Sequence, residues 1–198
     1  MLFKIKSYVR FFWNSSNQHG VHSPFIYNLV AKCFYDKKRY EEYSIIEKFR
    51  NKNKISADAK ISLLRLKLLF RIVKYFQPTI VVVVDSLSHR EKLSLSLGNP
   101  KAKFISLKEV KPLLAVNLIY FETNRFLNET IDQFELLLTT VSNNTVWIFN
   151  EIYANEETKK MWQAIKDHPK VQVTVDTFAF GIVFFRAEQQ KEHFVIRV

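Results

Sequence analysis

The most regular hydrophobic pattern in the chain is the run from Ile80 to Val84. Ile80 is followed by four valines, and no polar residue alternates with them. A run of this kind predicts a strand buried on both faces, as central parallel strands are. A helical segment at 91–97 follows, with Gly98 expected as a left-handed C′ residue, and then a second strand at 103–107. Strand, helix and strand in this order indicate a right-handed crossover in a parallel α/β sheet.

Four further strands are predicted after this unit, at 117–122, 145–150, 171–176 and 180–186. Only Thr177-Phe178-Ala179 separates the last two, which is too short for a crossover, so they must be antiparallel. Helices are expected at 126–141 and 156–166, and no strand is expected within 108–116. The pattern therefore predicts a mostly parallel sheet of about six strands that ends in an antiparallel hairpin.

Before the valine run, the sequence shows helical patterns and no strand pattern. Helices are predicted at 2–13, from Pro24 to about residue 35 with Ser23 as N-cap, at 41–50, and at 56–76 with Ser56 as N-cap. At 198 residues the chain is expected to be a single domain. Within it, an N-terminal basic helical region at 1–76 precedes an α/β core at 77–198.

Charge differs between these two regions. Residues 1–76 hold 16 Lys/Arg and 5 Asp/Glu, whereas residues 77–198 hold 14 of each. The excess indicates either a polyanionic partner, such as a nucleic acid, or a solvated helical layer. In the segment at 2–13, Lys4, Lys6 and Arg10 lie among apolar residues. This segment is expected to dock on protein, either its own chain or a second subunit of a homodimer, rather than on lipid.

Composition excludes several classes of protein. The lone Cys33 excludes an intrachain disulfide and is typical of a reducing compartment. No apolar run approaches the roughly 20 residues that a membrane span needs, so a cytoplasmic protein without a membrane span is expected. With three glycines in the chain, and no P-loop, Ser-His-Asp spacing or cysteine cluster, the familiar nucleotide and hydrolase motifs are excluded.

Several short motifs resemble one protein family. They are His19-Gly20-Val21-His22-Ser23-Pro24-Phe25, Tyr35-Asp36-Lys37-Lys38, Ser96-Leu97-Gly98-Asn99-Pro100, Leu118-Ile119-Tyr120-Phe121, and Asp176-Thr177-Phe178 through Gly181–Arg186 with Lys191-Glu192-His193-Phe194. Together they resemble a bacterial family of small O-methyltransferases with the class I S-adenosylmethionine-dependent fold, over nearly the whole chain. The resemblance implies a Rossmann-like methyltransferase fold, in which a seventh strand is inserted antiparallel beside the sixth.

The resemblance also shows where this chain departs from the family. The family's Gly-x-x-x-Gly turn falls on Val84 and Ser88, where side chains disfavour close approach of the backbone to a cofactor. The acid that holds the ribose hydroxyls falls on Lys108, which cannot accept their hydrogen bonds, and Glu109 comes one residue late. Between the second strand and Asn117 the family has a further helix and strand, but this chain has only about nine residues there. The chain is therefore interpreted as a shortened, degenerate member.

The cofactor positions that the resemblance assigns are Asp85, Ser86, Ser88, Glu109 and Glu122. Candidates for a catalytic role are Asn150 and Glu151, which replace the family's Asp–Asp pair. Because the carboxyl ends of parallel strands meet at one edge, we expect Asp85, Glu122 and the Asn150-Glu151 pair to converge there. Such oxygen donors hold Mg²⁺ in some O-methyltransferases, but they serve equally as helix caps or surface acids, so no metal site is predicted.

Three functions remain open from the sequence. The favoured hypothesis is a methyltransferase-like protein that has lost cofactor binding and acts as a non-catalytic partner-binding or regulatory module, with no cofactor expected. The alternative is an active S-adenosylmethionine-dependent O-methyltransferase with an unknown small-molecule substrate. The third is a nucleic-acid-associated module that uses the basic N-terminal region, and salt-dependent binding would identify it.

Overall fold

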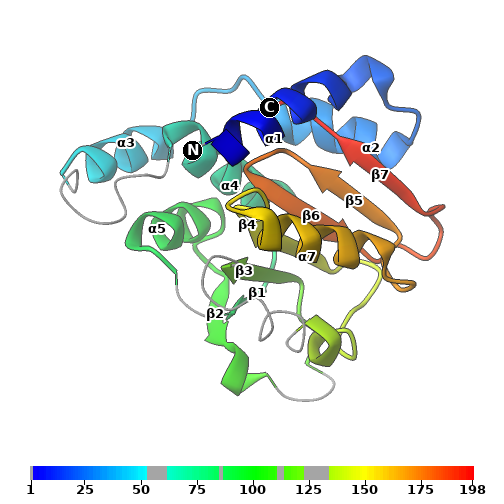
Figure 1. Ribbon diagram of the computed structural model, residues 1–198. Coiled ribbons are helices and arrows are strands. Elements are labelled where there is room, and N and C mark those ends of the chain that lie inside the picture. The colour runs from blue at the N-terminus through cyan, green and yellow to red at the C-terminus, as the bar shows by residue number, and fades with distance from the viewer. Residues whose placement is uncertain (1, 53–61, 85–86, 111–113, 123–133) are drawn as a thin grey trace. The chain divides into compact units, whose positions relative to one another are not determined.

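The computed structural model describes residues 2–52, 62–84, 87–110, 114–122 and 134–198 (Figure 1). The chain forms two compact units. The first comprises Met1–Gly20, Ile80–Asp85 and Phe104–Val198, and the second comprises Val21–Thr79 and Ser86–Lys103.

A seven-stranded sheet is the centre of the first unit, with the strand order β2-β1-β3-β4-β6-β5-β7. Its strands are β1 (Ile80–Val84), β2 (Lys103–Ser106), β3 (Leu118–Glu122), β4 (Val146–Asn150), β5 (Val173–Asp176), β6 (Phe180–Phe184) and β7 (Glu192–Val195). β3 pairs in parallel with β1 and β4, and β6 pairs antiparallel with both β4 and β5. The mostly parallel sheet, its antiparallel hairpin and the insertion of the hairpin's second strand are thereby confirmed.

The expectation of about six strands misses β7. This strand pairs in parallel with β5 at the sheet edge, with Val175 opposite Phe194. His193 lies in this strand, and its Nδ1 is 2.9 Å from Thr174 Oγ1. Such a short edge strand is set by its partner more than by its own propensity. The available signal was the alternation that buries Phe194 and Ile196.

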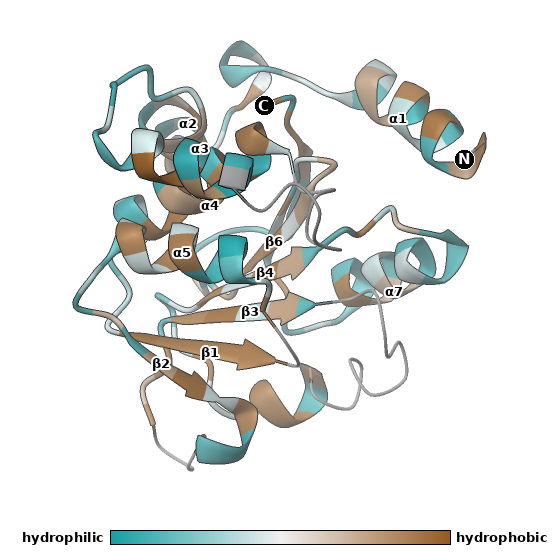
Figure 2. Ribbon diagram, turned by 90° about the vertical axis from the view of Figure 1, so that its left-hand side faces the viewer, coloured by the Kyte–Doolittle hydropathy of each residue, from teal (hydrophilic) through white to brown (hydrophobic). Residues whose placement is uncertain are grey.

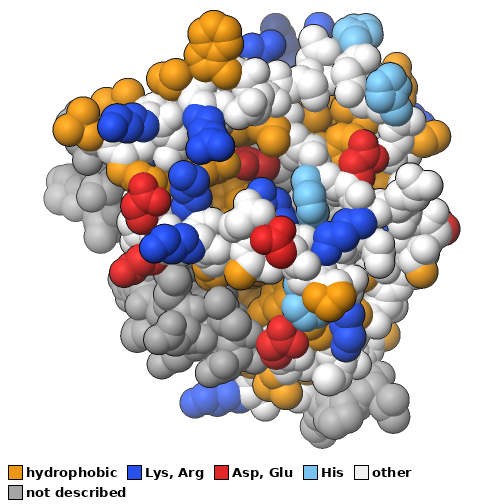
Figure 3. Space-filling model, turned by 45° about the vertical axis from the view of Figure 1, so that its right-hand side comes forward, with side chains coloured by type: hydrophobic (Ala, Val, Ile, Leu, Met, Phe, Trp, Pro, Cys, Tyr) orange, Lys and Arg blue, Asp and Glu red, His pale blue; other side chains and the backbone are white. Residues whose placement is uncertain are grey.

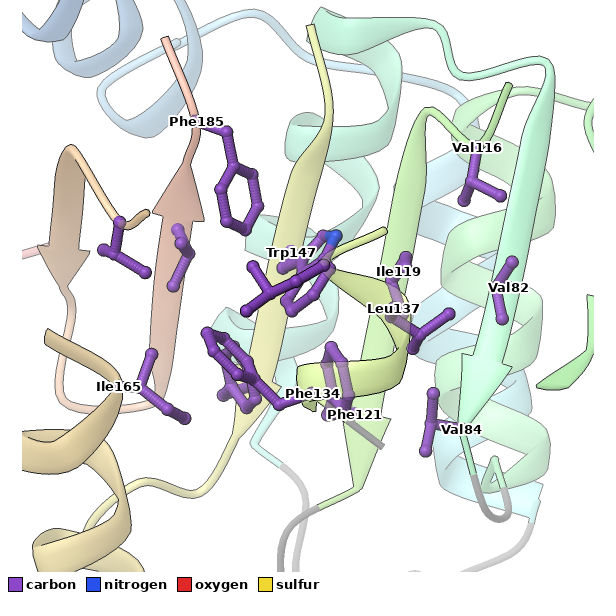
Figure 4. Close-up of a cluster of buried hydrophobic side chains, with 14 of the residues drawn as sticks. Val82, Val84, Val116, Ile119, Phe121, Phe134, Leu137, Trp147, Ile165 and Phe185 are labelled. Atoms are coloured by element: carbon purple, nitrogen blue, oxygen red, sulfur yellow. The ribbon is translucent and has the colours of Figure 1, made fainter. Parts of the chain in front are cut away.

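One face of the sheet carries a core of apolar side chains. Alternate residues of neighbouring strands, among them Val82, Ile119 and Trp147, project from the same side (Figure 4). The rings of Phe121 and Phe149 stack with their centroids 4.3 Å apart. Burial of so much apolar area is the main stabilising contribution to the sheet.

The helix α7 (Glu156–Asp167) packs on this core through Ile165 (Figure 4). Asn155 is its N-cap, and the helix ends just before His168-Pro169, as predicted. Of the helix predicted at 126–141, residues 134–137 are helical and contribute Phe134 to the same core. Residues 138–141 are not helical, so the prediction is wrong there, and its part up to residue 133 lies outside the described residues.

The predicted N-terminal helix is present in the first unit as α1 (Leu2–Asn14), followed by the short 3-10 helix η1 (Gln18–Gly20). Ser7 and Phe11 are the buried residues of α1. The rings of Tyr8 and Phe11 lie 5.0 and 5.4 Å from that of Phe178, in the turn between β5 and β6. One stripe of α1 therefore packs on its own chain.

The second unit is helical. It contains α2 (Pro24–Leu29), the π-helical turn η2 (Val30–Phe34), α3 (Glu42–Lys52), α4 (Leu63–Phe76) and α5 (His89–Gly98). The Ser23 side chain caps α2, as predicted. The expectation of one continuous helix at 56–76 is wrong at Ser62, which is extended and accepts the Arg65 N–H as the N-cap of α4. Ser56 lies outside the described residues.

The basic residues of α4 are partly neutralised within the second unit. Lys67 Nζ lies 2.5 Å from Glu47 Oε1, and Lys74 Nζ lies 3.5 Å from Glu42 Oε1, both in α3. Arg71 donates to a backbone carbonyl at 3.1 Å. Part of the N-terminal positive charge therefore pairs with the protein itself.

Gly98 is explained by packing and not by backbone conformation. It is the last residue of α5, and no described glycine has a positive φ, so the expected left-handed C′ role is wrong. A Cβ there would lie 2.7 Å from Val73 Cβ and 2.8 Å from the Phe70 carbonyl oxygen of α4. Gly98 lets the two helices approach closely.

Candidate functional site

Glu122 and Asn150 meet at the carboxyl ends of β3 and β4. They are register partners, and Asn150 Nδ2 donates to Glu122 Oε2 at 2.8 Å. Asn150 is buried and Glu122 is half-buried. The structure thus brings together one candidate cofactor residue and one candidate catalytic residue.

Glu151 makes different contacts. Its φ of 50° lies in the left-handed region, which costs a non-glycine residue about 1 kcal/mol. Its carboxylate lies 3.9 Å from Lys4 Nζ of α1, and its N–H donates to the Ala179 carbonyl at 3.0 Å. Glu151 therefore links the turn after β4 both to α1 and to the hairpin.

The two positions of the family's glycine turn are held by the chain's own structure. Val84 continues β1 as the partner of Phe121, and its side chain is fully buried. Ser88 is the N-cap of α5: its Oγ accepts the Glu91 N–H, and its own N–H donates to Glu91 Oε2 at 3.3 Å. Strand pairing therefore fixes the first position, and the N–H at the second is paired in a capping box. Asp85 and Ser86 lie outside the described residues.

The ribose-binding position is altered in a similar way. Glu109 Oε2 accepts from Ser106 N at 2.7 Å and from Ser106 Oγ at 2.8 Å, in the capping box of η4 (Leu107–Glu109). Lys108 is exposed. β2 is the edge strand of the sheet, so among the described residues no strand lies beyond it. The carboxylate nearest to the ribose-binding position of the family is therefore paired within the chain.

A pocket of about 500 Å³ lies in the first unit between α1 and α7, away from the strand ends of β1 and β2. Its lining residues are Ser7, Arg10, Phe11, Asn14, Tyr153, Glu156, Lys159, Lys160, Trp162, Gln163, Lys166, Asp176 and Val195. Within the described part of the chain, Arg10, Lys160 and Lys166 form no ion pair. The pocket is therefore suited to a ligand with an anionic group, and the sequence interpretation missed it because its residues come from three distant segments.

A tyrosine–aspartate pair lies in this pocket. Tyr153 donates its hydroxyl to Asp176 Oδ2 at 2.5 Å, and the Phe178 N–H donates to Asp176 Oδ1 at 2.7 Å. Asp176 is buried. Burial raises the pKa of Asp176 above its ordinary value, although these hydrogen bonds oppose the rise, and burial also raises the pKa of Tyr153. At the end of β5, the desolvation of the Asp176 carboxyl therefore outweighs the hydrogen bonds that favour its ionised form.

The raised pKa of Asp176 predicts a pH-dependent stability. Because the folded state holds this proton more tightly than the unfolded chain does, stability falls as the pH rises from the unfolded pKa through the folded one. Asp176→Asn cannot ionise, so its stability relative to the wild type should be higher at about pH 8 than at about pH 4. Urea unfolding at both pH values measures this difference. Asp167→Asn, which removes an exposed carboxylate, is the control, and a difference for Asp176→Asn that does not grow with pH contradicts the prediction.

In the described part of the chain, no group of three or more His, Cys, Asp or Glu side chains could hold a metal ion.

The mostly parallel sheet and its inserted antiparallel strand are features of the class I methyltransferase fold. No family model matches the sequence, and no curated protein matches it. Among solved structures, the chain is similar to the methyltransferase PaMTH1 from Podospora anserina, which is bound to S-adenosylhomocysteine. The TM-score is 0.58 at 10% identity, over 83% of this chain and 97% of that one.

A second similar structure is that of TomG from Streptomyces achromogenes, an O-methyltransferase of tomaymycin synthesis in complex with S-adenosylmethionine. The TM-score is 0.52 at 9% identity, over 76% of this chain and 92% of that one. At these identities the similarity shows the fold alone. The methyltransferase-like Rossmann fold is thereby confirmed.

Proposed function

We propose that this protein is a non-catalytic member of the methyltransferase fold, which acts as a partner-binding or regulatory module without S-adenosylmethionine. One observation carries the proposal: the polar groups at the altered cofactor positions are paired within the chain. In one capping box the Ser88 N–H donates to the Glu91 carboxylate, and in the other the Glu109 carboxylate accepts from Ser106. Val84 adds a buried side chain where the family has a glycine.

The pocket between α1 and α7 supports a binding role. It has the volume of a small-molecule site, and its unpaired cations and its Tyr153–Asp176 pair provide polar groups for recognition. A ligand with a carboxylate or phosphate group and an apolar body fits this lining best. Calorimetric titration of the full chain with S-adenosylmethionine and S-adenosylhomocysteine tests the proposal, and no saturable binding is expected.

An active O-methyltransferase is the second candidate. It is favoured by the Glu122–Asn150 pair at the carboxyl edge of the sheet and by the solved neighbours that are bound to S-adenosylmethionine or S-adenosylhomocysteine. In this reading, the pair would position a substrate hydroxyl. Release of S-adenosylhomocysteine by the purified chain in the presence of small-molecule extracts, lost in Glu122→Gln and retained in the exposed Glu188→Gln, would favour the enzyme over the module.

A further inference from the structure

We propose that α1 is a membrane-surface helix whose exposed apolar face binds acidic lipid. Six of the eleven large hydrophobic side chains that are exposed in the described residues belong to this helix. They are Leu2, Ile5, Tyr8, Val9, Phe12 and Trp13, with Leu2 76% and Trp13 82% exposed. Such a concentration on one short element marks an interaction surface.

Five of these residues form one stripe, which is distinct from the buried one, and Tyr8 lies at its border because its ring also contacts Phe178. Leu2, Ile5, Val9 and Phe12 recur at intervals of three and four residues, as the face of a helix does. The buried residues, Ser7 and Phe11, form the stripe that packs on the protein. α1 therefore has two apolar faces, and much of its ribbon is brown in the hydropathy view (Figure 2). The sequence expectation that the helix docks on protein accounts for one face only.

The shape of the exposed face suits apolar groups that insert from outside. A groove of about 460 Å³ runs along Tyr8, Val9, Phe12 and Trp13. Tryptophan, tyrosine and phenylalanine side chains favour the boundary between headgroups and acyl chains. No described helix, α1 included, is long and apolar enough to span a bilayer, so binding would be along the surface.

The positive charge of α1 indicates that the partner of this face is acidic. Lys4, Lys6 and Arg10 are exposed on the helix, and of these only Lys4 has a carboxylate nearby among the described residues, that of Glu151 at 3.9 Å. The chain has no acidic residue before Asp36. The Arg197 guanidinium lies over the Phe12 ring, 4.8 Å from its centroid, and adds a further cation. Hydrophobic side chains also reach the surface beside Lys and Arg side chains at the top of the space-filling view (Figure 3).

A second copy of the chain fits this pattern less well than an acidic membrane does. Two α1 helices face to face would bring their cations together, and neither helix would contribute a carboxylate to pair with them. Acidic headgroups supply the missing negative charge, and the acyl region accepts the apolar stripe. This inference does not depend on whether the protein binds S-adenosylmethionine.

Trp13 is a natural reporter of lipid binding. It is highly exposed, whereas the other two tryptophans, Trp147 and Trp162, are buried. With vesicles of equal parts phosphatidylglycerol and phosphatidylcholine, we expect the full chain to sediment with the lipid. Its emission should shift to shorter wavelength and become protected from acrylamide. Vesicles of phosphatidylcholine alone should bind far less, and raising the NaCl concentration should release the protein.

Variants separate the charge from the apolar face. Lys6→Gln with Arg10→Gln should weaken partitioning by about 25-fold, since each cation near an acidic surface contributes about fivefold. Ile5→Ser with Val9→Ser should weaken it by at least about tenfold. Both pairs of residues are exposed, so the fold should tolerate the changes. Circular dichroism checks that it does.

Matched controls come from exposed positions outside α1. Lys101→Gln with Lys170→Gln removes two exposed lysines, and Leu64→Ser removes a side chain that is 77% exposed. Both controls should partition like the wild type, and Trp13→Phe should keep sedimentation but lose the emission shift. The proposal is overturned if the wild type does not bind acidic vesicles, or if the α1 variants bind as it does. A dimer in light scattering, with Trp13 shielded from acrylamide without lipid, overturns it in favour of a second copy.

Discussion

Titration of the full chain with S-adenosylmethionine or S-adenosylhomocysteine should give no saturable heat at physiological ligand concentrations. Three positions account for this expectation. Val84 is held in the β1–β3 ladder, the Ser88 N–H donates to Glu91, and Glu109 accepts from Ser106. A nucleoside bound at these positions would have to break two capping boxes or leave its own polar groups unpaired.

The size of the effect follows from the cost of those losses. Each buried hydrogen bond that the ligand fails to make costs roughly 1–3 kcal/mol. Two or three such losses weaken binding by about a hundredfold or more, so an affinity of about 1 μM would become about 0.1 mM or weaker.

Two controls accompany the titration: one checks that the protein is folded, and the other locates any binding that is observed. Unchanged circular dichroism of the titrated sample shows that the protein is folded. Saturable binding with one ligand per chain would contradict the expectation, and it would point to the ribose position if Glu109→Ala abolished it while the exposed Glu188→Ala did not. In that case Glu109 would leave its capping box to accept the ribose hydroxyls, and the enzyme hypothesis would be restored.

The architecture was largely readable from the sequence because its strongest signals are local. A run of four valines with no polar alternation can only be buried on both sides, and it became a central strand. The three-residue link at 177–179 forced an antiparallel pair. The place of β6 between β4 and β5 came from the family resemblance and not from any pattern in the strand itself. β7 was missed because its pairing partner lies about 20 residues earlier and its own four residues carry little preference.

The candidate site was readable only in part, for the same reason. Glu122 and Asn150 each end a predicted parallel strand, and the carboxyl ends of parallel strands meet at one edge of a sheet. Their proximity could therefore be predicted. The Ser-x-x-Glu signatures at Ser88 and Ser106 are visible in the sequence, and they could have predicted both capping boxes. The Tyr153–Asp176 hydrogen bond and the pocket around it depend on tertiary placement, so no spacing along the chain could indicate them.

Replacing Gly181 by Ala should be among the most destabilising single-methyl changes in the first unit. Gly181 lies in β6 between β4 and β5, and a Cβ there would lie 2.7–2.8 Å from three carbons of the Trp162 six-membered ring. Both residues are buried, so neither ring nor strand can move into solvent. Overpacking of this kind costs roughly 1–3 kcal/mol of the free energy of unfolding. Urea denaturation of the full chain measures it.

A double-mutant cycle ties the loss to that contact. Trp162→Phe removes the part of the indole that a new Cβ would strike, at the cost of a cavity in the core. Gly181→Ala should therefore cost clearly less in the Trp162→Phe background than in the wild type, with a coupling of about 1 kcal/mol or more. Gly20→Ala is the comparison: its Cβ would lie 2.9 Å from Ser16 Cβ, in a turn without buried residues, so Trp162→Phe should leave its cost unchanged. Equal costs for Gly181→Ala in both backgrounds would show that the glycine is needed for the strand backbone and not for the indole above it.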